Sequence, residues 1–236
     1  MYQADIAIVG AGMVGLALAR SLKEADLSVI LIDTTPIAKP LSEQPELRVS
    51  AFNAANKQVL EQLGVWQHLD QQRLSAYTQM QVWDQDSFGR IQFSSEEMGT
   101  SELGHIIENQ SLVNALHHQV SQQPNVQMLP STRIAKVLAG QSETMLMLDS
   151  DEVVSCRLLV GADGANSAIR KYANFPLTFK DYGHTAIVAT IKTAAPHGKV
   201  ARQVFTPTGP LALLPLSDPN LCSIVWSQNS QQADEL

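Results

Sequence analysis

The stretch from Ile6 to Leu22 constrains the fold of this chain more than any other. It opens with a short apolar run, most of it β-branched, which predicts a buried strand. Gly10, Gly12 and Gly15 follow at once in the spacing G-x-G-x-x-G, and apolar residues at helical spacing come after them. A strand, a glycine-rich turn and a helix in this order predict the start of an α/β fold with a parallel sheet.

Each glycine of this turn has its own steric role. Gly10 allows the tight turn, Gly12 lets the backbone approach a pyrophosphate because it has no Cβ, and Gly15 lets the helix pack against the sheet. The helix N-terminus offers free N–H groups and partial positive charge to that pyrophosphate. A second predicted strand, residues 28–32, ends at Asp33, where a carboxylate binds the ribose of an adenine dinucleotide. Together these features predict dinucleotide binding.

Two other interpretations of the same stretch are weaker. The glycines could form a packing turn without a ligand. The segment could also be a membrane span or a signal peptide, but it is short and rich in glycine, and no basic region precedes it. Asp5 stands where a signal peptide would have Lys or Arg.

Composition excludes several classes of function. With 236 residues, 44% of them hydrophobic and 17% charged, the chain is long enough for one large domain or two small ones. A net charge of −7 without a Lys/Arg block argues against nucleic acid as a partner. Cys156 and Cys222 have no metal spacing and are typical of buried thiols in a reducing compartment. The histidines show no ligand pattern, so no metal site is predicted.

Two later stretches carry further candidate residues. Arg48 precedes a predicted helix that Ser50 or Asn53 could cap, and by spacing alone it is an ordinary surface charge. Residues 161–171, GADGANSAIRK, place small residues and Asp163 between a buried strand and a helix. Ligands of open α/β sheets collect at such a strand end, although the same residues would equally form a tight turn with an Asp cap.

The remaining pattern alternates between two kinds of sheet. Residues 80–93 predict two antiparallel strands, and residues 179–226 predict long strands with little helix between them. Residues 108–123 predict a helix, and short strands between 126 and 154 predict an antiparallel ribbon. We therefore expect a mixed α/β (α+β) chain, in which a Rossmann-like domain with a parallel sheet is interleaved with an antiparallel-sheet domain.

Three motifs in this order, GAGMVG, LRVSAFNAAN and GADGANSAIR, resemble the flavin-dependent aromatic hydroxylases of the p-hydroxybenzoate hydroxylase type. Later blocks, among them PLTFKDYGHTAIVATIKT and LPLSDPNLCSIVWS, narrow the resemblance to the ubiquinone-biosynthesis hydroxylases, and within them to the 2-octaprenylphenol hydroxylases. The resemblance extends over the whole chain. It implies an FAD-binding domain over residues 1–72 and 104–177, and a substrate domain over residues 73–103 and 178–236.

The resemblance also implies the contacts to FAD. The cofactor-binding residues would be Gly10, Gly12, Gly15, Asp33, Arg48, Asn109, Asp163, Gly164 and Arg170. The glycines would hold the pyrophosphate and Asp33 the adenosine ribose. Arg48 and Asn109 stand where such enzymes place an arginine and a polar residue against FAD. The DG motif at residues 163–164, completed by Arg170, is associated with both FAD and the nicotinamide donor.

The same resemblance implies the reaction. NADH or NADPH would reduce FAD, O2 would add at flavin C4a to give a hydroperoxide, and one oxygen would pass to the ring of a polyprenylated phenol. The flavin carries the chemistry, so no catalytic side chain is predicted. Because a polyprenylated substrate lies in the membrane, the resemblance implies a cytoplasmic protein with peripheral contact to the inner membrane and to other ubiquinone-biosynthesis proteins.

Two other functions stay open, a flavin hydroxylase of a soluble phenol and a non-catalytic dinucleotide-binding module. The family carries a later G-D motif that holds the ribityl chain and the flavin ring, and then a long helical region, and neither occurs here. Residues 230–236 predict a helix that starts without finishing. We therefore expect a truncated chain that binds FAD weakly or not at all and is inactive by itself.

Overall fold

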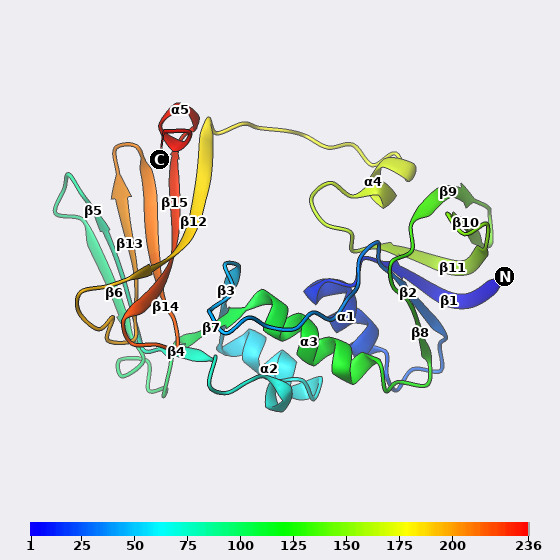
Figure 1. Ribbon diagram of the computed structural model, residues 1–236, viewed down its shortest axis with the longest axis horizontal. Helices are drawn as coiled ribbons and strands as arrows, with labels where there is room; N and C mark the ends of the chain where they lie inside the picture. Colours follow the sequence, from blue (N-terminus) through cyan, green and yellow to red (C-terminus); the bar gives the residue numbers. More distant parts are fainter. Residues whose placement is uncertain (236) are drawn as a thin grey trace. The chain divides into compact units, whose positions relative to one another are not determined.

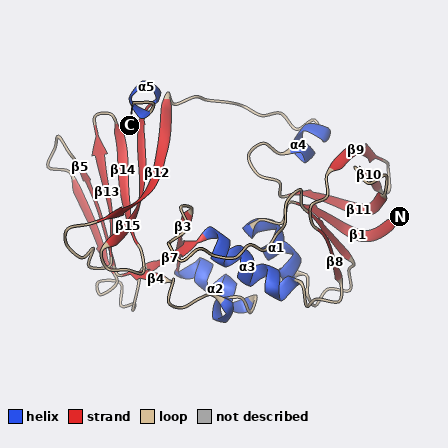
Figure 2. Ribbon diagram, in the orientation of Figure 1, coloured by secondary structure: helices blue, strands red, loops and turns tan. Residues whose placement is uncertain are grey.

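The computed structural model describes residues 1–235, and the chain forms two compact units. Figure 1 colours the elements by their position in the chain, and Figure 2 colours them by secondary structure. Unit 1 comprises residues 1–40, 63–65 and 112–178, and unit 2 comprises residues 41–62, 66–111 and the chain from residue 179 onward. Each unit is therefore assembled from separate stretches of sequence.

Unit 1 is built on a six-stranded sheet in the order β8-β2-β1-β11-β10-β9. Its strands are β1 (Tyr2–Val9), β2 (Val29–Ile32), β8 (Val126–Leu129), β9 (Ile134–Ala139), β10 (Thr144–Leu148) and β11 (Val153–Gly161). β8, β2, β1 and β11 are parallel, and β10 and β9 continue the sheet with antiparallel pairing. All four residues of β2 are buried, as expected for a parallel strand covered on both faces.

Three helices belong to unit 1 wholly or in large part. α1 (Met13–Ser21) contacts β1 and β2, and its buried residues include Gly15, Leu16 and Ala19. α3 (Asn109–Val120) belongs to this unit from Leu112 onward and buries an apolar stripe that ends at Val120. The short α4 (Ala168–Tyr172) follows β11. The spacing of buried residues on α1 and α3 is that of amphipathic helices.

Unit 2 contains a six-stranded sheet in the order β12-β15-β14-β13-β5-β6. Its strands are β5 (Gln79–Asp84), β6 (Arg90–Ser94), β12 (His184–Lys192), β13 (Val200–Thr206), β14 (Gly209–Pro215) and β15 (Leu221–Asn229). Neighbouring strands are antiparallel except for β5 and β13, which pair in parallel. The predicted grouping of residues 80–93 with the strands after residue 179 is therefore confirmed.

A smaller sheet completes unit 2. β3 (Val49–Asn53) and β4 (Ser75–Tyr77) flank β7 (Gly104–Glu108). α2 (Ala54–Gln62), the 3-10 helix η1 (Trp66–His68) and α5 (Ser230–Ala233) are the helical segments. A buried apolar cluster of Tyr77, Ile106, Ala201 and Leu216 joins the two sheets of this unit. Every helix in the described part of the chain is too short or too polar to cross a membrane.

Three local expectations were wrong. The entry to the predicted helix after Arg48 is the strand β3, because it pairs with β7. The helix α2 then begins after Asn53, and this one of the two predicted caps is confirmed, because its Oδ1 accepts a hydrogen bond from the Asn56 N–H at 2.9 Å. Residues 126–129 form the parallel edge strand β8 rather than part of a ribbon, and residues 153–161 form one strand instead of two. Each error concerns pairing between distant segments.

The predicted domains and the observed units divide the chain differently. Residues 41–62, 66–72 and 104–111, which the predicted FAD-binding domain includes, belong to unit 2, and Thr178 of the predicted substrate domain belongs to unit 1. The units follow contacts, whereas the domains were predicted by function, so the functional division remains a prediction. The sequence predicts the start of a helix over residues 230–236, and the last of these, Leu236, lies outside the described residues.

Candidate nucleotide-binding site

A pocket of about 340 Å³ in unit 1 adjoins the glycine turn. β1, β2 and β11 all end at it, and its lining includes Gly10, Gly12, Asp33, Asp163 and Gly164. The carboxyl ends of parallel strands are where ligands bind in open α/β sheets. The structure thus brings most of the predicted residues of this unit to one place.

Two glycines of the turn are required by the fold itself. Gly10 has φ +104°, and a Cβ on it would lie 2.3 Å from the carbonyl oxygen of Ala162. A Cβ on Gly15 would lie 1.8 Å from the carbonyl oxygen of Gly10. These distances are far below van der Waals contact, so the close passage of the turn, α1 and the segment after β11 depends on both glycines.

Gly12 is different, because the fold does not require it. It caps α1 with φ −73° and ψ −173°, a conformation open to any residue. A Cβ built on it would meet no atom within 4 Å. Within the described structure the cap has no side-chain hydrogen bond, and the first turn of α1 holds no acidic residue. Open space beside unused helix N–H groups suits a phosphate group.

Asp33 follows β2 and binds the glycine turn directly. Its Oδ2 accepts a hydrogen bond from the N–H of Ala11 at 2.7 Å. Its Oδ1 accepts from the N–H and the hydroxyl of Thr35 at 2.8 and 2.9 Å. A carboxylate oxygen has capacity for two hydrogen bonds, so Oδ2 retains room for a ribose hydroxyl. The carboxylate therefore combines an internal brace with the predicted ligand position.

Asp163 closes the turn before α4. Its Oδ1 accepts from the hydroxyl of Ser167 at 2.5 Å, and its Oδ2 accepts from the N–H groups of Ala168 and Ile169 at 2.6 and 3.2 Å. Gly164 next to it has φ +83°. These contacts form a tight turn with an Asp cap, which was one of the two structures predicted for this stretch. The turn also lines the pocket.

Arg170 does not line this pocket. Its Nη2 donates to the carbonyl oxygen of Ala165 at 2.8 Å. It borders a second pocket of about 410 Å³, together with Leu158 and Phe175. Residues 158–161 of β11 pair with β1 and with no other described strand. The second pocket therefore lies along the unpaired edge of β11.

Arg48 and Asn109 lie together in unit 2. The N–H of Asn109 donates to the carbonyl oxygen of Arg48 at 2.9 Å. The side-chain Oδ1 of Asn109 accepts from the hydroxyl of Ser50 at 2.7 Å. The Arg48 side chain is exposed. The start of α3 thereby holds the backbone just before β3.

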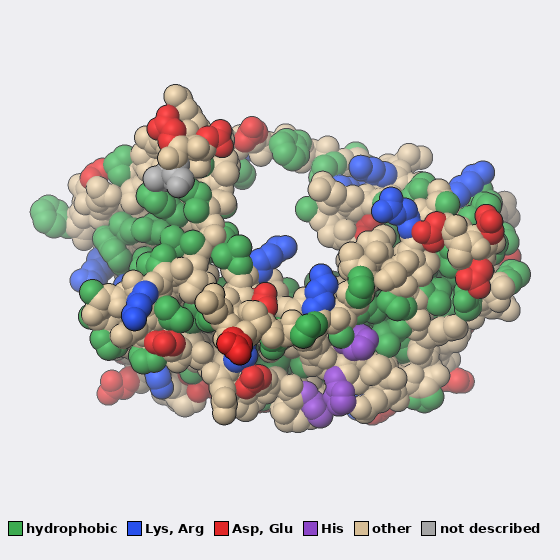
Figure 3. All heavy atoms as spheres, viewed as in Figure 1, with side chains coloured by type: hydrophobic (Ala, Val, Ile, Leu, Met, Phe, Trp, Pro, Cys, Tyr) green, Lys and Arg blue, Asp and Glu red, His purple; other side chains and the backbone are tan. Residues whose placement is uncertain are grey.

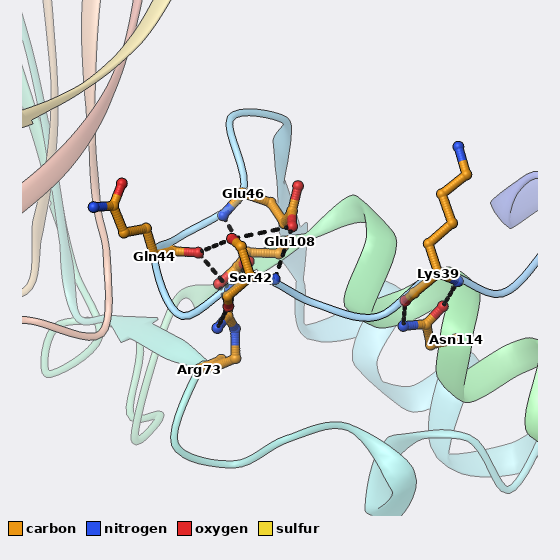
Figure 4. A network of polar contacts seen from close by, with 7 residues as sticks. All are labelled: Lys39, Ser42, Gln44, Glu46, Arg73, Glu108 and Asn114. Carbon is orange, nitrogen blue, oxygen red and sulfur yellow. Dashed lines mark hydrogen bonds and ion pairs between the residues drawn. The ribbon is translucent and has the colours of Figure 1, made fainter.

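A buried ion pair, which the sequence motifs did not predict, anchors the loop before β3 (Figure 4). Glu108 is 5% exposed and receives two hydrogen bonds from the guanidinium of Arg73, at 3.0 and 2.5 Å. Arg73 also donates to the carbonyl oxygens of Ser42 and Gln44, and Glu108 accepts from the N–H of Glu46. The contact with Glu108 raises the pKa of Arg73. An acid ending the apolar strand HIIE was the one sequence signal for this pair.

A family model described as FAD binding domain matches residues 3–234. The chain belongs to the FAD binding domain family. Its glycine turn has the features that the ADP half of FAD requires, namely open space at Gly12, the N-terminus of α1 beginning at that residue, and a carboxylate at the end of β2. The residues present therefore fit the cofactor of the family.

Several curated relatives of this FAD binding domain carry names from ubiquinone metabolism. The chain is 35% identical over 244 residues to the mitochondrial ubiquinone biosynthesis monooxygenase COQ6 of Drosophila melanogaster. This alignment covers 98% of the chain and 51% of the relative. It is 32% identical over 233 residues to 3-demethoxyubiquinol 3-hydroxylase of Escherichia coli, with coverage of 98% and 59%. The predicted resemblance to the ubiquinone-biosynthesis hydroxylases is confirmed, and the chain spans about half the length of these relatives.

Solved structures confirm the predicted fold class. The crystal structure of PqsL from P. aeruginosa in complex with 2-aminobenzoylacetate matches with a TM-score of 0.83 and 19% identity. The match covers 99% of this chain and 63% of that one. At this identity the likeness concerns the fold alone.

Proposed function

We propose that this FAD binding domain is part of a monooxygenase that hydroxylates the aromatic ring of a polyprenylated phenol in ubiquinone biosynthesis. The observation that carries the proposal is the match of 98% of the chain to a ubiquinone biosynthesis monooxygenase. The open pocket at the glycine turn supports it, because an FAD-dependent enzyme needs a site for the ADP half of its cofactor.

The residues of unit 1 bind and orient the cofactor in this proposal. The turn at Gly10 and Gly12 and the N-terminus of α1 hold the pyrophosphate, Asp33 holds the ribose, and the turn at Asp163 and Gly164 closes the pocket. Bound FAD supplies oxygen activation, with NADH or NADPH as the electron donor. No side chain of the chain is assigned a role as acid, base or nucleophile.

Arg48, Asn109 and Arg170 keep the FAD roles that the family resemblance implies. The hydrogen bond between the Asn109 N–H and the Arg48 carbonyl supports a shared role for the first two. For Arg170, the bond to Ala165 supports a role in holding the turn of the DG motif in shape.

The large sheet of unit 2 is the proposed substrate wall. Strand register places Ile91, Phe93, Val188 and Phe205 on one face of this sheet, and all four are at least 36% exposed. Figure 3 shows hydrophobic side chains gathered over these strands. An apolar face suits an aromatic ring with a polyprenyl tail. Because such a substrate lies in the bilayer, the proposal includes a peripheral membrane contact and delivery by other proteins of the pathway.

The test compares two phenols as substrates. Both are offered to the protein produced from the complete gene and to the 236-residue chain. Each is titrated with FAD by absorbance, and NADH and NADPH oxidation is followed with a short-chain prenylphenol or with p-hydroxybenzoate. The expected product, identified by mass, is the prenylphenol with one added oxygen. Turnover of p-hydroxybenzoate alone would favour a hydroxylase of soluble phenols. Flavin binding without turnover of either phenol would favour a non-catalytic module.

A further inference from the structure

Arg133 lines the nucleotide pocket, and no motif of the sequence singles it out. Among the described residues that line this pocket, the charged ones are Asp33, Asp163 and Arg133. Two negative charges thus border a space that would receive the negative pyrophosphate of a nucleotide. The pocket needs a positive charge if it is to bind such a ligand, and Arg133 is the side chain that carries one.

Both carboxylates already have partners within the protein. Asp33 accepts hydrogen bonds from Ala11 and from Thr35, and Asp163 accepts from Ser167 and from the backbone at the start of α4. None of these partners is a cation, so the hydrogen bonds do not cancel the charge of either carboxylate. The guanidinium of Arg133 is the available counter-charge.

The backbone of Arg133 is held in place on both sides. Its N–H donates to the carboxylate of Asp149 at 3.3 Å, and its carbonyl oxygen accepts from the Asp149 N–H at 2.9 Å. The preceding residue, Thr132, donates its N–H to the carbonyl oxygen of Asp33 at 2.8 Å. The segment between β8 and β9 is therefore pinned beside Asp33. The side chain of Arg133 is exposed and has no hydrogen bond or ion pair with any other described residue.

We propose that Arg133 binds the pyrophosphate of the ADP half of FAD and offsets the charges of Asp33 and Asp163. A guanidinium matches phosphate oxygens through paired N–H donors, and a side chain without internal partners gives up none when it binds. This inference rests on the proposed FAD site and adds a specific cationic contact to it.

The experiment measures nucleotide affinity by calorimetry in the protein from the complete gene after removal of FAD. The probes are ADP, which carries the pyrophosphate, and adenosine, which lacks it. Arg133→Gln should weaken ADP binding about tenfold or more, the loss expected for one charge-assisted phosphate contact. Its adenosine affinity should match that of the wild type. Arg133→Lys, which keeps the charge, should recover part of the ADP affinity.

Three further measurements keep the test specific. Lys136→Gln removes an exposed cation from the adjoining strand β9, outside the pocket lining, and should leave ADP affinity unchanged. The ADP affinity of the wild type should fall more steeply with added salt than that of Arg133→Gln. Thermal unfolding of Arg133→Gln should match the wild type, since the side chain has no internal partner.

The outcomes separate this inference from the proposed function. Wild-type ADP affinity in Arg133→Gln, or an equal loss for adenosine and ADP, would overturn the role of Arg133 while leaving the FAD site in place. If the wild-type protein binds neither ADP nor FAD, the proposed site is wrong and the role of Arg133 is wrong with it.

Discussion

The Oδ2 atom of Asp33 accepts a hydrogen bond from the N–H of Ala11 at 2.7 Å. Asp33 follows β2, and Ala11 lies inside the glycine turn that follows β1. The N–H of Gly10 also donates to the carbonyl oxygen of Ile32 at 2.8 Å. These two contacts attach the turn to the neighbouring strand, so the residue predicted to bind the ribose also holds the loop predicted to bind the pyrophosphate.

Replacing Asp33 with Ala should weaken FAD binding by about 1–3 kcal/mol, because ribose hydroxyls and the Ala11 N–H lose their acceptor. A fluorescence titration of the flavin measures the dissociation constant. Asp26→Ala, at an exposed position of the same unit, is the matched control and should bind FAD as the wild type does. An unchanged constant in Asp33→Ala would mean that the acid is misassigned.

Gly12→Val should abolish FAD binding without unfolding the protein. The backbone at Gly12 has an ordinary negative φ and the side-chain space is empty, so the cost to the fold is about 1 kcal/mol or less. The valine would occupy the space proposed for the pyrophosphate. Absorbance of the purified variant measures bound flavin, and thermal unfolding measures the fold. A variant that keeps its yellow colour contradicts the prediction.

Gly15→Ala should have the opposite effect and destabilise the fold. The added methyl would lie 1.8 Å from the carbonyl oxygen of Gly10, so α1 must move away from the turn. Overpacking against the backbone costs roughly 3 kcal/mol or more. Denaturant unfolding of Gly15→Ala and Gly12→Ala side by side tests the contrast. Equal stability of the two variants would refute the distinction between the two glycines.

Arg73→Met should lower the free energy of unfolding by roughly 3–5 kcal/mol, because it leaves the buried carboxylate of Glu108 without its cation. The control is Arg157→Met, which removes an ion pair to Asp5 from a side chain that is 75% exposed. That change should cost less than about 1 kcal/mol. Urea unfolding of both variants gives the comparison, and a loss no larger in Arg73→Met would rule out a structural role for the pair.

His105 should make the protein less stable in weak acid. It is buried on β7 with its ring edge-on to Trp66, at a centroid distance of 4.9 Å. Burial lowers the pKa of His105 below its usual 6.5; the nearby Glu102 carboxylate raises the pKa by a smaller amount, and the Lys57 ammonium lowers it slightly further. The unfolded chain therefore takes up a proton first as the pH falls. The contribution of neutral, buried His105 to the free energy of unfolding is fully present above about pH 6.5, and it declines as the pH falls below that value.

His105→Phe keeps a ring against Trp66 and removes the titrating group. Its free energy of unfolding should decline less than that of the wild type between about pH 7 and pH 5. Burial also lowers the pKa of His117, so part of the decline should remain. Urea unfolding at several pH values measures the slope. Identical slopes in variant and wild type would show that His105 is not the source.

The turn at Gly10 to Gly15 could be predicted because all of its signals are local. Apolar runs, glycine spacing and the acid at Asp33 lie within one short stretch, and each acts on its immediate neighbours. The pair of Arg73 and Glu108 could not be predicted in the same way. Arg73 lies just before β4 and Glu108 ends β7, so their meeting depends on the pairing of these two strands.

The sequence by itself determined the strand, turn and helix of the nucleotide site and the family to which the chain belongs. Tertiary structure alone decided that β5 pairs with β13, that Asp33 braces the turn and that Arg133 borders the same pocket. The physical reason is range. Propensity and periodicity act over a few residues, whereas strand pairing and burial join segments whose separation along the chain leaves no local pattern.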